Sequence, residues 1–251
     1  MKLLKLSPVL LALPAAAVVN IENMNAQPTR IGWSGLAEAA LEARYGNSER
    51  EAIKLGGRAD WFSGEDTAFL VSAYEYGQSV GVKDADSYFL HGRYIDAQTR
   101  VMSYEAFAQH EQNEFLRLKR RDLAGVGVRF VRDDNVARMQ NTFAIGVFHS
   151  DELIEGLDGE ANQSETAIYG NLYWVFKWQI NENTNLANTV YYQPAIKGDD
   201  DLHLMNLFAL QVRIDGRLYL KLSLDVNHDS DPPNGIKNTD TRLLSGISYE
   251  F

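Results

Sequence analysis

Two short stretches of the sequence hold residue types that can do nucleophilic chemistry. His149-Ser150 places a base beside a hydroxyl, but the hydroxyl is activated only if the two side chains share a hydrogen bond. Neighbouring side chains of an extended strand point to opposite faces, so this pair is poorly placed for catalysis. The run His228-Asp229-Ser230-Asp231 contains the letters of a catalytic triad, but a triad is recognised by geometry, and the prolines that follow indicate a loop. We therefore predict no catalytic residue and no enzyme activity.

Acidic runs offer oxygen ligands for divalent cations. The run Asp199-Asp200-Asp201 and the carboxylates between Asp151 and Glu160 are ligands of the type that Ca²⁺ and Mg²⁺ take. Neither run has the spacing of a dedicated calcium loop. Solvated loops are the simpler interpretation, and divalent bridging to anionic lipopolysaccharide is a weaker one. We predict neither a metal site nor a cofactor.

The largest set of chemically capable residues consists of charged side chains at alternate positions of otherwise apolar segments. On the inner wall of a barrel they would line the lumen. The predicted lumen-lining residues are Glu38, Glu42, Arg44, Lys54, Arg58, Asp60, Glu75, Arg93, Glu105, Arg129, Lys177, Arg213, Arg217, Lys221, Asp225 and Arg242. Their mixed signs allow ion pairs that brace the interior, or a polar channel lining, and both interpretations stay open.

Strands must position these residues, and a period of two recurs along the chain. Within residues 33–45 apolar or small residues form one face and charged residues the other, and within residues 218–226 one face is too apolar for water. We predict an all-β fold, a transmembrane antiparallel up-and-down β-barrel of about twelve strands. The third strand is the least regular, because Phe69 and Val71 break its alternation. The expected strands are residues 32–45, 51–62, 67–77, 86–96, 100–110, 121–132, 138–149, 166–179, 185–196, 201–214, 217–227 and 239–251.

The connections between these strands alternate in length. Tight turns are expected at residues 63–66, 96–99, 181–184 and 215–216. Longer polar loops are expected at residues 78–85, 111–120, 150–165, 197–200 and 227–238. This alternation is typical of periplasmic turns and external loops, and an even strand number then places both termini in the periplasm.

The chain closes on an alternating apolar strand that ends in an aromatic residue. Ile247, Tyr249 and Phe251 share one face and form the pattern that the barrel-assembly machinery of Gram-negative bacteria reads as a membrane-insertion signal. We therefore expect the cell outer membrane, with its lipid and lipopolysaccharide as partners.

The other end of the chain resembles a secretory signal. Lys2 and Lys5 precede an apolar run at residues 10–19, which is too short to span a bilayer as a helix. Cleavage is possible after the alanines at 15–17 or, as we favour, after Ala26, so the expected division is a signal peptide, 1–26, and an outer-membrane barrel, 27–251.

Composition agrees with this class of protein. The 251 residues include no cysteine, which excludes a disulfide framework, and the mean hydropathy of −0.29 is compatible with a barrel whose apolar residues alternate with polar ones. The net charge of −10 argues against nucleic-acid binding.

One segment carries a family resemblance. The stretch YEAFAQHEQNEF at 104–115 resembles the YdiY-like salt-induced outer-membrane proteins. The resemblance continues through Leu118, Arg121, Leu123, Gly125, Gly127, Arg129 and Phe130. Trp33 and Gly46-Asn47, around the first strand, resemble the same family. That family has no assigned function, so the resemblance implies a barrel and its location but no active site. The acidic stretch at 151–165 has no counterpart in the family pattern.

Three functions remain for such a barrel. The first is a narrow pore for small polar solutes or ions. The second is a non-conducting envelope protein, tied through the resemblance to salt or osmotic stress, and the third and weakest is a lipid hydrolase. A soluble β-sandwich is a minor alternative for the fold.

Overall fold

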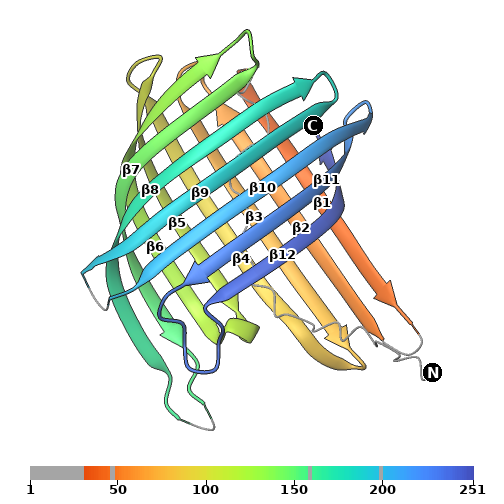
Figure 1. Cartoon of the computed structure of the whole chain (residues 1–251), viewed down its shortest axis with the longest axis vertical. Coiled ribbons are helices and arrows are strands. Elements are labelled where there is room, and N and C mark those ends of the chain that lie inside the picture. Colours follow the sequence, from red (N-terminus) through yellow and green to blue (C-terminus); the bar gives the residue numbers. More distant parts are fainter. Residues whose placement is uncertain (1–30, 46–48, 158–159, 198–199) are drawn as a thin grey trace, which may run out of the picture.

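The chain folds into a closed β-barrel in the computed structural model, which describes residues 31–45, 49–157, 160–197 and 200–251 (Figure 1). Every strand is antiparallel to the next along the chain, and β12 pairs with β1 to close the barrel. The strands are β1 (Gly32–Arg44), β2 (Arg50–Phe62), β3 (Thr67–Ser79), β4 (Val82–Ala97), β5 (Met102–Asn113), β6 (Leu118–Asp134), β7 (Met139–Ile154), β8 (Gln163–Asn181), β9 (Thr184–Lys197), β10 (Leu202–Asp215), β11 (Leu218–Asp229) and β12 (Thr239–Glu250). The predicted fold class and strand number are confirmed, whereas the predicted signal peptide, 1–26, lies outside the described residues.

Side chains alternate between the outer surface and the lumen, as the sequence predicts. On β11, Leu220, Leu222 and Leu224 are exposed on the outside, while Tyr219 and Ser223 are buried inside. A surface of this kind is stable against lipid, and closure leaves few backbone groups without partners. The closed barrel overturns the β-sandwich alternative. Among the described residues, no helix is long and apolar enough to span a membrane.

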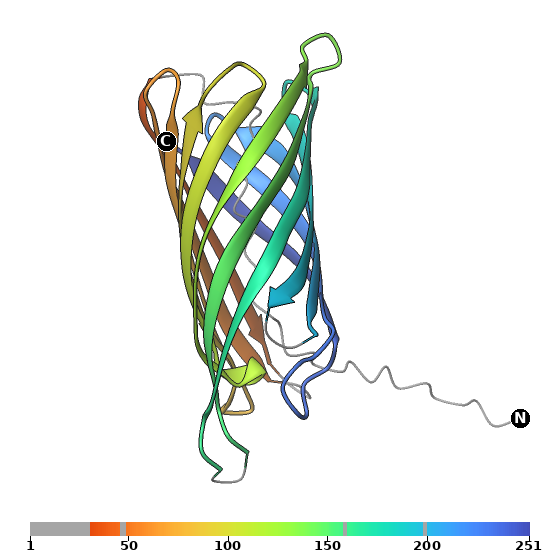
Figure 2. The ribbon, with the colours of Figure 1, turned by 90° about the vertical axis from the view of Figure 1, so that its left-hand side faces the viewer.

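The two ends of the barrel differ. Gly35 and Phe251 exchange backbone hydrogen bonds of 3.0 Å, so the first and last strands meet near one end, which we call the terminal end (Figure 2). The hairpins at the terminal end are short, whereas the opposite end, the loop end, carries the longer β7–β8 and β11–β12 connections. The predicted alternation of short and long connections holds in part, because the β3–β4 connection at the loop end is only two residues long.

Two predicted loops are mostly strand. Only Val80 and Gly81 separate β3 from β4, and a single 3₁₀ turn, η1 (Glu114–Leu116), joins β5 to β6. Polar residues in these segments form ion pairs, as Lys83 does with Asp86 on the same strand and with Glu114 of η1. The polar composition of these two segments was therefore not a sign of a loop, because strands at this end of the barrel also carry polar residues.

The irregular third strand is explained by the lumen. Phe69 and Val71 point inward and pack with Phe89 of β4 in an apolar cluster inside the barrel. They break the alternation because part of the interior is apolar.

The seam between β1 and β12 is short. β1 pairs with β2 along its whole length, from Gly32 to Arg44, but with β12 only from Leu36 to Ala39. Just beyond this pairing, the Phe251 ring lies over Gly35, where a Cβ atom would come within 2.5 Å of it. Ile247, Tyr249 and Phe251 are all exposed on the outer face of this closing strand.

Candidate functional site

Four side chains from four strands converge in the lumen. Arg93 of β4 and Arg129 of β6 each place Nη1 near the same oxygen, Oε2 of Glu105 on β5, at 3.0 and 3.3 Å. The hydroxyl of Tyr173 on β8 donates a 2.7 Å hydrogen bond to that oxygen and accepts hydrogen bonds of 3.0 and 2.8 Å from Arg93 and Arg129. We call these four residues the central belt.

The strand register produces this convergence. Glu105 lies opposite Gly127 of β6, which in turn lies opposite Gly146 of β7. A Cβ atom on Gly127 would come within 3.0 Å of the Glu105 carboxylate. The missing side chain therefore leaves room for Glu105 beside both arginines.

Aromatic rings hold the arginines of the belt. The Arg93 guanidinium lies 5.2 Å from the ring centroid of Phe107 and 5.7 Å from that of Phe69. Arginine is attracted to the face of such rings when water is excluded. The His91 ring stacks against the same two phenylalanines. With two guanidinium groups and one carboxylate, the belt carries an excess positive charge, and its geometry is fixed by both ions and rings.

A second group of charges lies nearer the loop end and has the opposite composition. Arg121 of β6 lies between Glu111 of β5, at 2.8 Å, and Glu152 of β7, at 2.7 Å. The Ser150 hydroxyl donates a 3.0 Å hydrogen bond to Glu152. These residues, which we call the Arg121 group, carry one excess negative charge.

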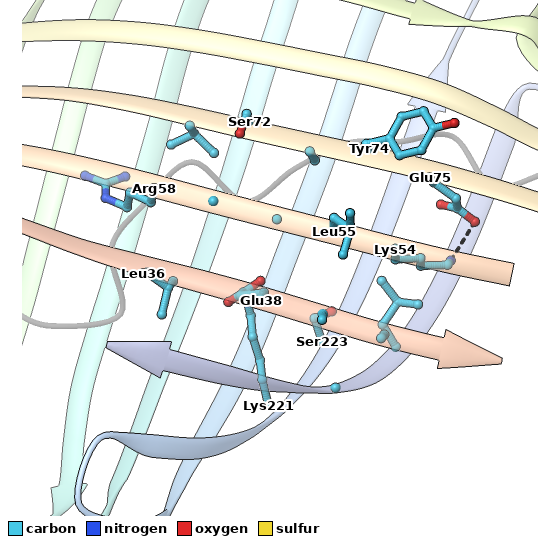
Figure 3. A pocket seen from close by; sticks show the side chains of 18 of the residues that line it. Leu36, Glu38, Lys54, Leu55, Arg58, Ser72, Tyr74, Glu75, Lys221 and Ser223 are labelled. Atoms are coloured by element: carbon cyan, nitrogen blue, oxygen red, sulfur yellow. Dashed lines mark hydrogen bonds and ion pairs between the residues drawn. The ribbon is translucent and has the colours of Figure 1, made fainter. Parts of the chain in front are cut away.

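A third group lies beside the seam, where Figure 3 shows Lys54 joined to Glu75 and Lys221 extending to Glu38. Arg242 of β12 reaches Asp225 of β11 at 3.0 Å and Glu75 of β3 at 3.3 Å. This last contact joins strands on either side of β1 and β2, so ion pairs reinforce the barrel where backbone pairing is short.

Cavities lie on both sides of the central belt. The cavity at the terminal end has a volume of about 710 Å³ and is lined by Arg129 and Lys177 among others. On the other side, Arg93 and Arg121 line a middle cavity of about 100 Å³. Arg121 also lines a loop-end cavity of about 130 Å³. The belt thus lies between a large cavity at the terminal end and smaller cavities toward the loop end, each lined by both charged and apolar side chains.

Most of the predicted lumen residues point inward. The structure places Glu38, Glu42, Lys54, Arg58, Asp60, Glu75, Arg93, Glu105, Arg129, Lys177, Lys221, Asp225 and Arg242 on the inner face. Arg58 forms hydrogen bonds of 2.7 and 2.9 Å with Asp60, and Arg50 pairs with Glu42.

Three predicted residues lie at or near strand ends. Arg213 is on the inner face near the end of β10, opposite Tyr219, to whose hydroxyl its Nε donates a 3.2 Å hydrogen bond. Arg217 is exposed in the turn before β11, so it does not line the lumen wall; the strand begins one residue later than predicted. The side chain of Arg44 lies outside the described residues.

Sequence reasoning missed the residues that complete the two groups. Tyr173 was recognised as inward-facing but not as the hydroxyl that joins three charges. Arg121 and Glu152 fell at the edge of predicted loops. The available signal was the period of two, which continues through Glu111 and Glu152 beyond the predicted strand ends.

The two histidine stretches do not form a catalytic arrangement. The Ser150 side chain is buried in the lumen, whereas His149 lies on the outer face and its Nδ1 contacts the Ser150 carbonyl. His228 Nδ1 contacts the Thr239 hydroxyl at 2.8 Å.

Comparisons with known proteins agree with the barrel. A family model described as "Protein of unknown function, DUF481" matches residues 37–251, and no curated protein matches the sequence. Similar solved structures include the NanC porin, with 11% identity, a TM-score of 0.48, and coverage of 86% of this chain and 96% of that one. The KdgM porin in complex with disordered oligogalacturonate has 11% identity and a TM-score of 0.44, with 87% and 99% coverage. The translocator domain of the autotransporter NalP from Neisseria meningitidis has 10% identity and a TM-score of 0.46, with 91% coverage of each chain.

Proposed function

Because the chain belongs to the DUF481 family, whose function is unknown, we propose a function from the lumen itself: a narrow outer-membrane passage for small polar solutes or ions. The observation that carries this proposal is the central belt, a charged group that crosses the lumen between two cavities, each with charged residues in its lining. Rings of charged side chains are a common way for a pore to select its solutes.

The belt would set the selectivity of this passage. Arg93 and Arg129 outnumber Glu105, so an anion meets a favourable potential at the constriction. Because the Tyr173 hydroxyl contacts all three charged groups, it holds them together across the wall from β4 to β8. Its removal should widen the constriction.

The proposed orientation follows from the lengths of the connections. Bacterial barrels place short turns in the periplasm and longer loops outside the cell. On this basis the terminal end, where β1 begins and β12 ends, faces the periplasm, and the loop end faces the exterior.

Single-channel recording in planar bilayers tests the proposal. The wild-type barrel should give defined conductance steps, and Tyr173→Ala should increase their size. Leu172→Ala is the matched control, because Leu172 is the neighbouring residue and is exposed on the outer face. Arg129→Glu, or Arg129→Gln if the reversal does not fold, should shift the preference toward cations. The absence of steps from folded wild-type and Tyr173→Ala barrels would reject the pore.

The second candidate is a non-conducting envelope barrel, and the mutual pairing of the belt residues favours it. Ion pairs of this kind, including Arg242 with Glu75, can serve to brace the wall. The same recordings distinguish the two candidates. Lipid hydrolysis has the least support, since Ser150 and His149 lie on opposite sides of the wall.

A further inference from the structure

A cluster at the loop end combines the donors of a metal site. His203, near the start of β10, lies opposite Asp229, the last residue of β11. Asp201 precedes β10. One ligand atom from each of these residues lies within 4.8 Å of the other two. The cluster lies outside the central belt and has no part in the proposed constriction.

The spacing suits a small divalent cation. His203 Nε2 lies 2.9 Å from Asp201 Oδ2 and 3.7 Å from Asp229 Oδ2. Ligands bound at about 2.0–2.2 Å in a tetrahedral zinc site are separated by roughly 3.3 Å. The two distances from His203 Nε2 lie on either side of this separation, so the imidazole is spaced from each carboxylate as in a site for an ion of this size.

Surrounding groups orient the donors. The Tyr169 ring stacks on His203, with ring centroids 5.1 Å apart, and its hydroxyl donates a 2.8 Å hydrogen bond to Asp201 Oδ2. The Ser230 hydroxyl donates a 3.0 Å hydrogen bond to the other oxygen of Asp201. Groups that orient ligands in this way are typical of metal sites in proteins.

An unsatisfied acceptor lies in the same cavity. The side-chain oxygen of Asn227, two residues before Asp229 on β11, is buried and accepts no hydrogen bond. Asn227 lines the loop-end cavity together with Asp201, His203 and Asp229. Buried polar atoms in proteins are nearly always satisfied, so an acceptor of this kind indicates a partner in the cavity, which is either a water molecule or a cation.

We propose that Asp201, His203 and Asp229 bind a divalent transition-metal ion, of which Zn²⁺ is the best fit. An imidazole nitrogen favours Zn²⁺ over Ca²⁺ and Mg²⁺, which take oxygen ligands almost alone. Three protein ligands leave a further position open to water or a solute in the loop-end cavity. The bound ion would also join the start of β10 to the end of β11. This site revises the expectation that the Asp199–Asp201 run serves only as a solvated loop.

A protonated histidine paired with two carboxylates is the competing explanation, and it needs no metal. The two differ in their response to ions. Purified barrel in detergent is stripped with chelator, and its thermal unfolding is followed with Zn²⁺, with Mg²⁺ and with chelator alone. The proposal expects a higher unfolding temperature with Zn²⁺ only, and a loss of this effect below about pH 6, where protons compete for imidazole.

Variants locate the site. His203→Gln should abolish the Zn²⁺ effect. His228→Gln should retain it, because His228 is the neighbour of Asp229 on β11, so its side chain belongs to the opposite face of the strand, and its Nδ1 contacts Thr239 instead. Tyr169→Phe removes only the hydrogen bond to Asp201 and should weaken Zn²⁺ binding about 10–100-fold in calorimetric titration. If His203→Gln does not fold, Asp229→Asn replaces it.

Cobalt gives an independent readout. Co²⁺ bound by these residues should produce visible absorption bands in the wild type and in His228→Gln, and none in His203→Gln or Asp229→Asn. Equal effects of Zn²⁺ and Mg²⁺ on the wild type, or Zn²⁺ binding that persists in both ligand variants, would overturn the proposal and leave the ion-paired histidine.

Discussion

The central belt and the Arg121 group are built from the same residue types in opposite proportions. The belt has one carboxylate between two arginines, and the Arg121 group has one arginine between two carboxylates. Their burial differs as well: the Glu105 side chain is 0% exposed, whereas that of Arg121 is 24% exposed. The excess positive charge of the belt thus lies deep in the lumen, and the excess negative charge of the Arg121 group lies nearer the loop end. The sign of the charge therefore changes along the length of the lumen.

Removing the middle member of the belt should have the largest effect. Glu105→Gln removes the carboxylate that Arg93 and Arg129 share. Breaking a buried ion pair in this way costs about 3–5 kcal/mol. Urea unfolding followed by gel mobility measures the loss, and Glu65→Gln, in an exposed turn, is the control. A loss as small as the control's would mean that the belt does not stabilise the barrel.

The comparison requires that both groups face inward, and a pair of variants on β11 tests the register. Leu222→Arg should cost about 2–4 kcal/mol if this outward position lies near the bilayer midplane. Lys221→Leu should cost less, since its side chain faces the lumen, where it pairs with Glu38. Equal losses in lipid vesicles would indicate that the strand is shifted by one residue.

The Arg121 group should respond more weakly, and its response should depend on pH. Arg121→Gln leaves Glu111 and Glu152 facing each other, at a cost of about 1–3 kcal/mol near neutral pH. Without the arginine the two carboxylates repel each other. Protonation in acid removes this repulsion, so the loss should shrink toward pH 4. The loss in Glu105→Gln should not shrink, because arginine stays charged. Parallel pH profiles for the two variants would contradict the assigned compositions.

The smallest effect on equilibrium stability is expected at the seam, where both groups depend on closure of the barrel. Deletion of Phe251, or Phe251→Ser, should slow insertion and lower the yield of folded barrel in assembly assays, and Tyr249→Ser should act in the same direction. Gly35→Ala should resemble these variants, because its Cβ would displace the Phe251 ring. Unchanged folding rates in all of them would show that the terminal aromatic has no role in assembly.

The alternation of apolar and polar residues predicted the strands and which face of each strand points into the lumen, because a period of two is a local property of the sequence. It predicted that Arg93 and Glu105 face the lumen. It could not predict that Tyr173 joins them, since this contact crosses from β4 and β5 to β8 and depends on closure. The sequence also placed Arg217 on the lumen wall, because Arg217 continues the alternation of β11. In the structure Arg217 belongs to the preceding turn, and β11 begins at Leu218. The Asp201–His203–Asp229 cluster likewise combines residues from two strands and a connection.

The short seam has a consequence for how the barrel opens. Toward the loop end, the edge of β1 from Ala40 to Arg44 has no paired partner on β12. The outward-pointing amide protons of this edge have no strand partner. Those of β7 are hydrogen-bonded, because β7 pairs along its whole length with both β6 and β8. In hydrogen–deuterium exchange, this edge should therefore take up deuterium earliest among the strands. When the barrel unfolds, separation of the strands should begin at this edge.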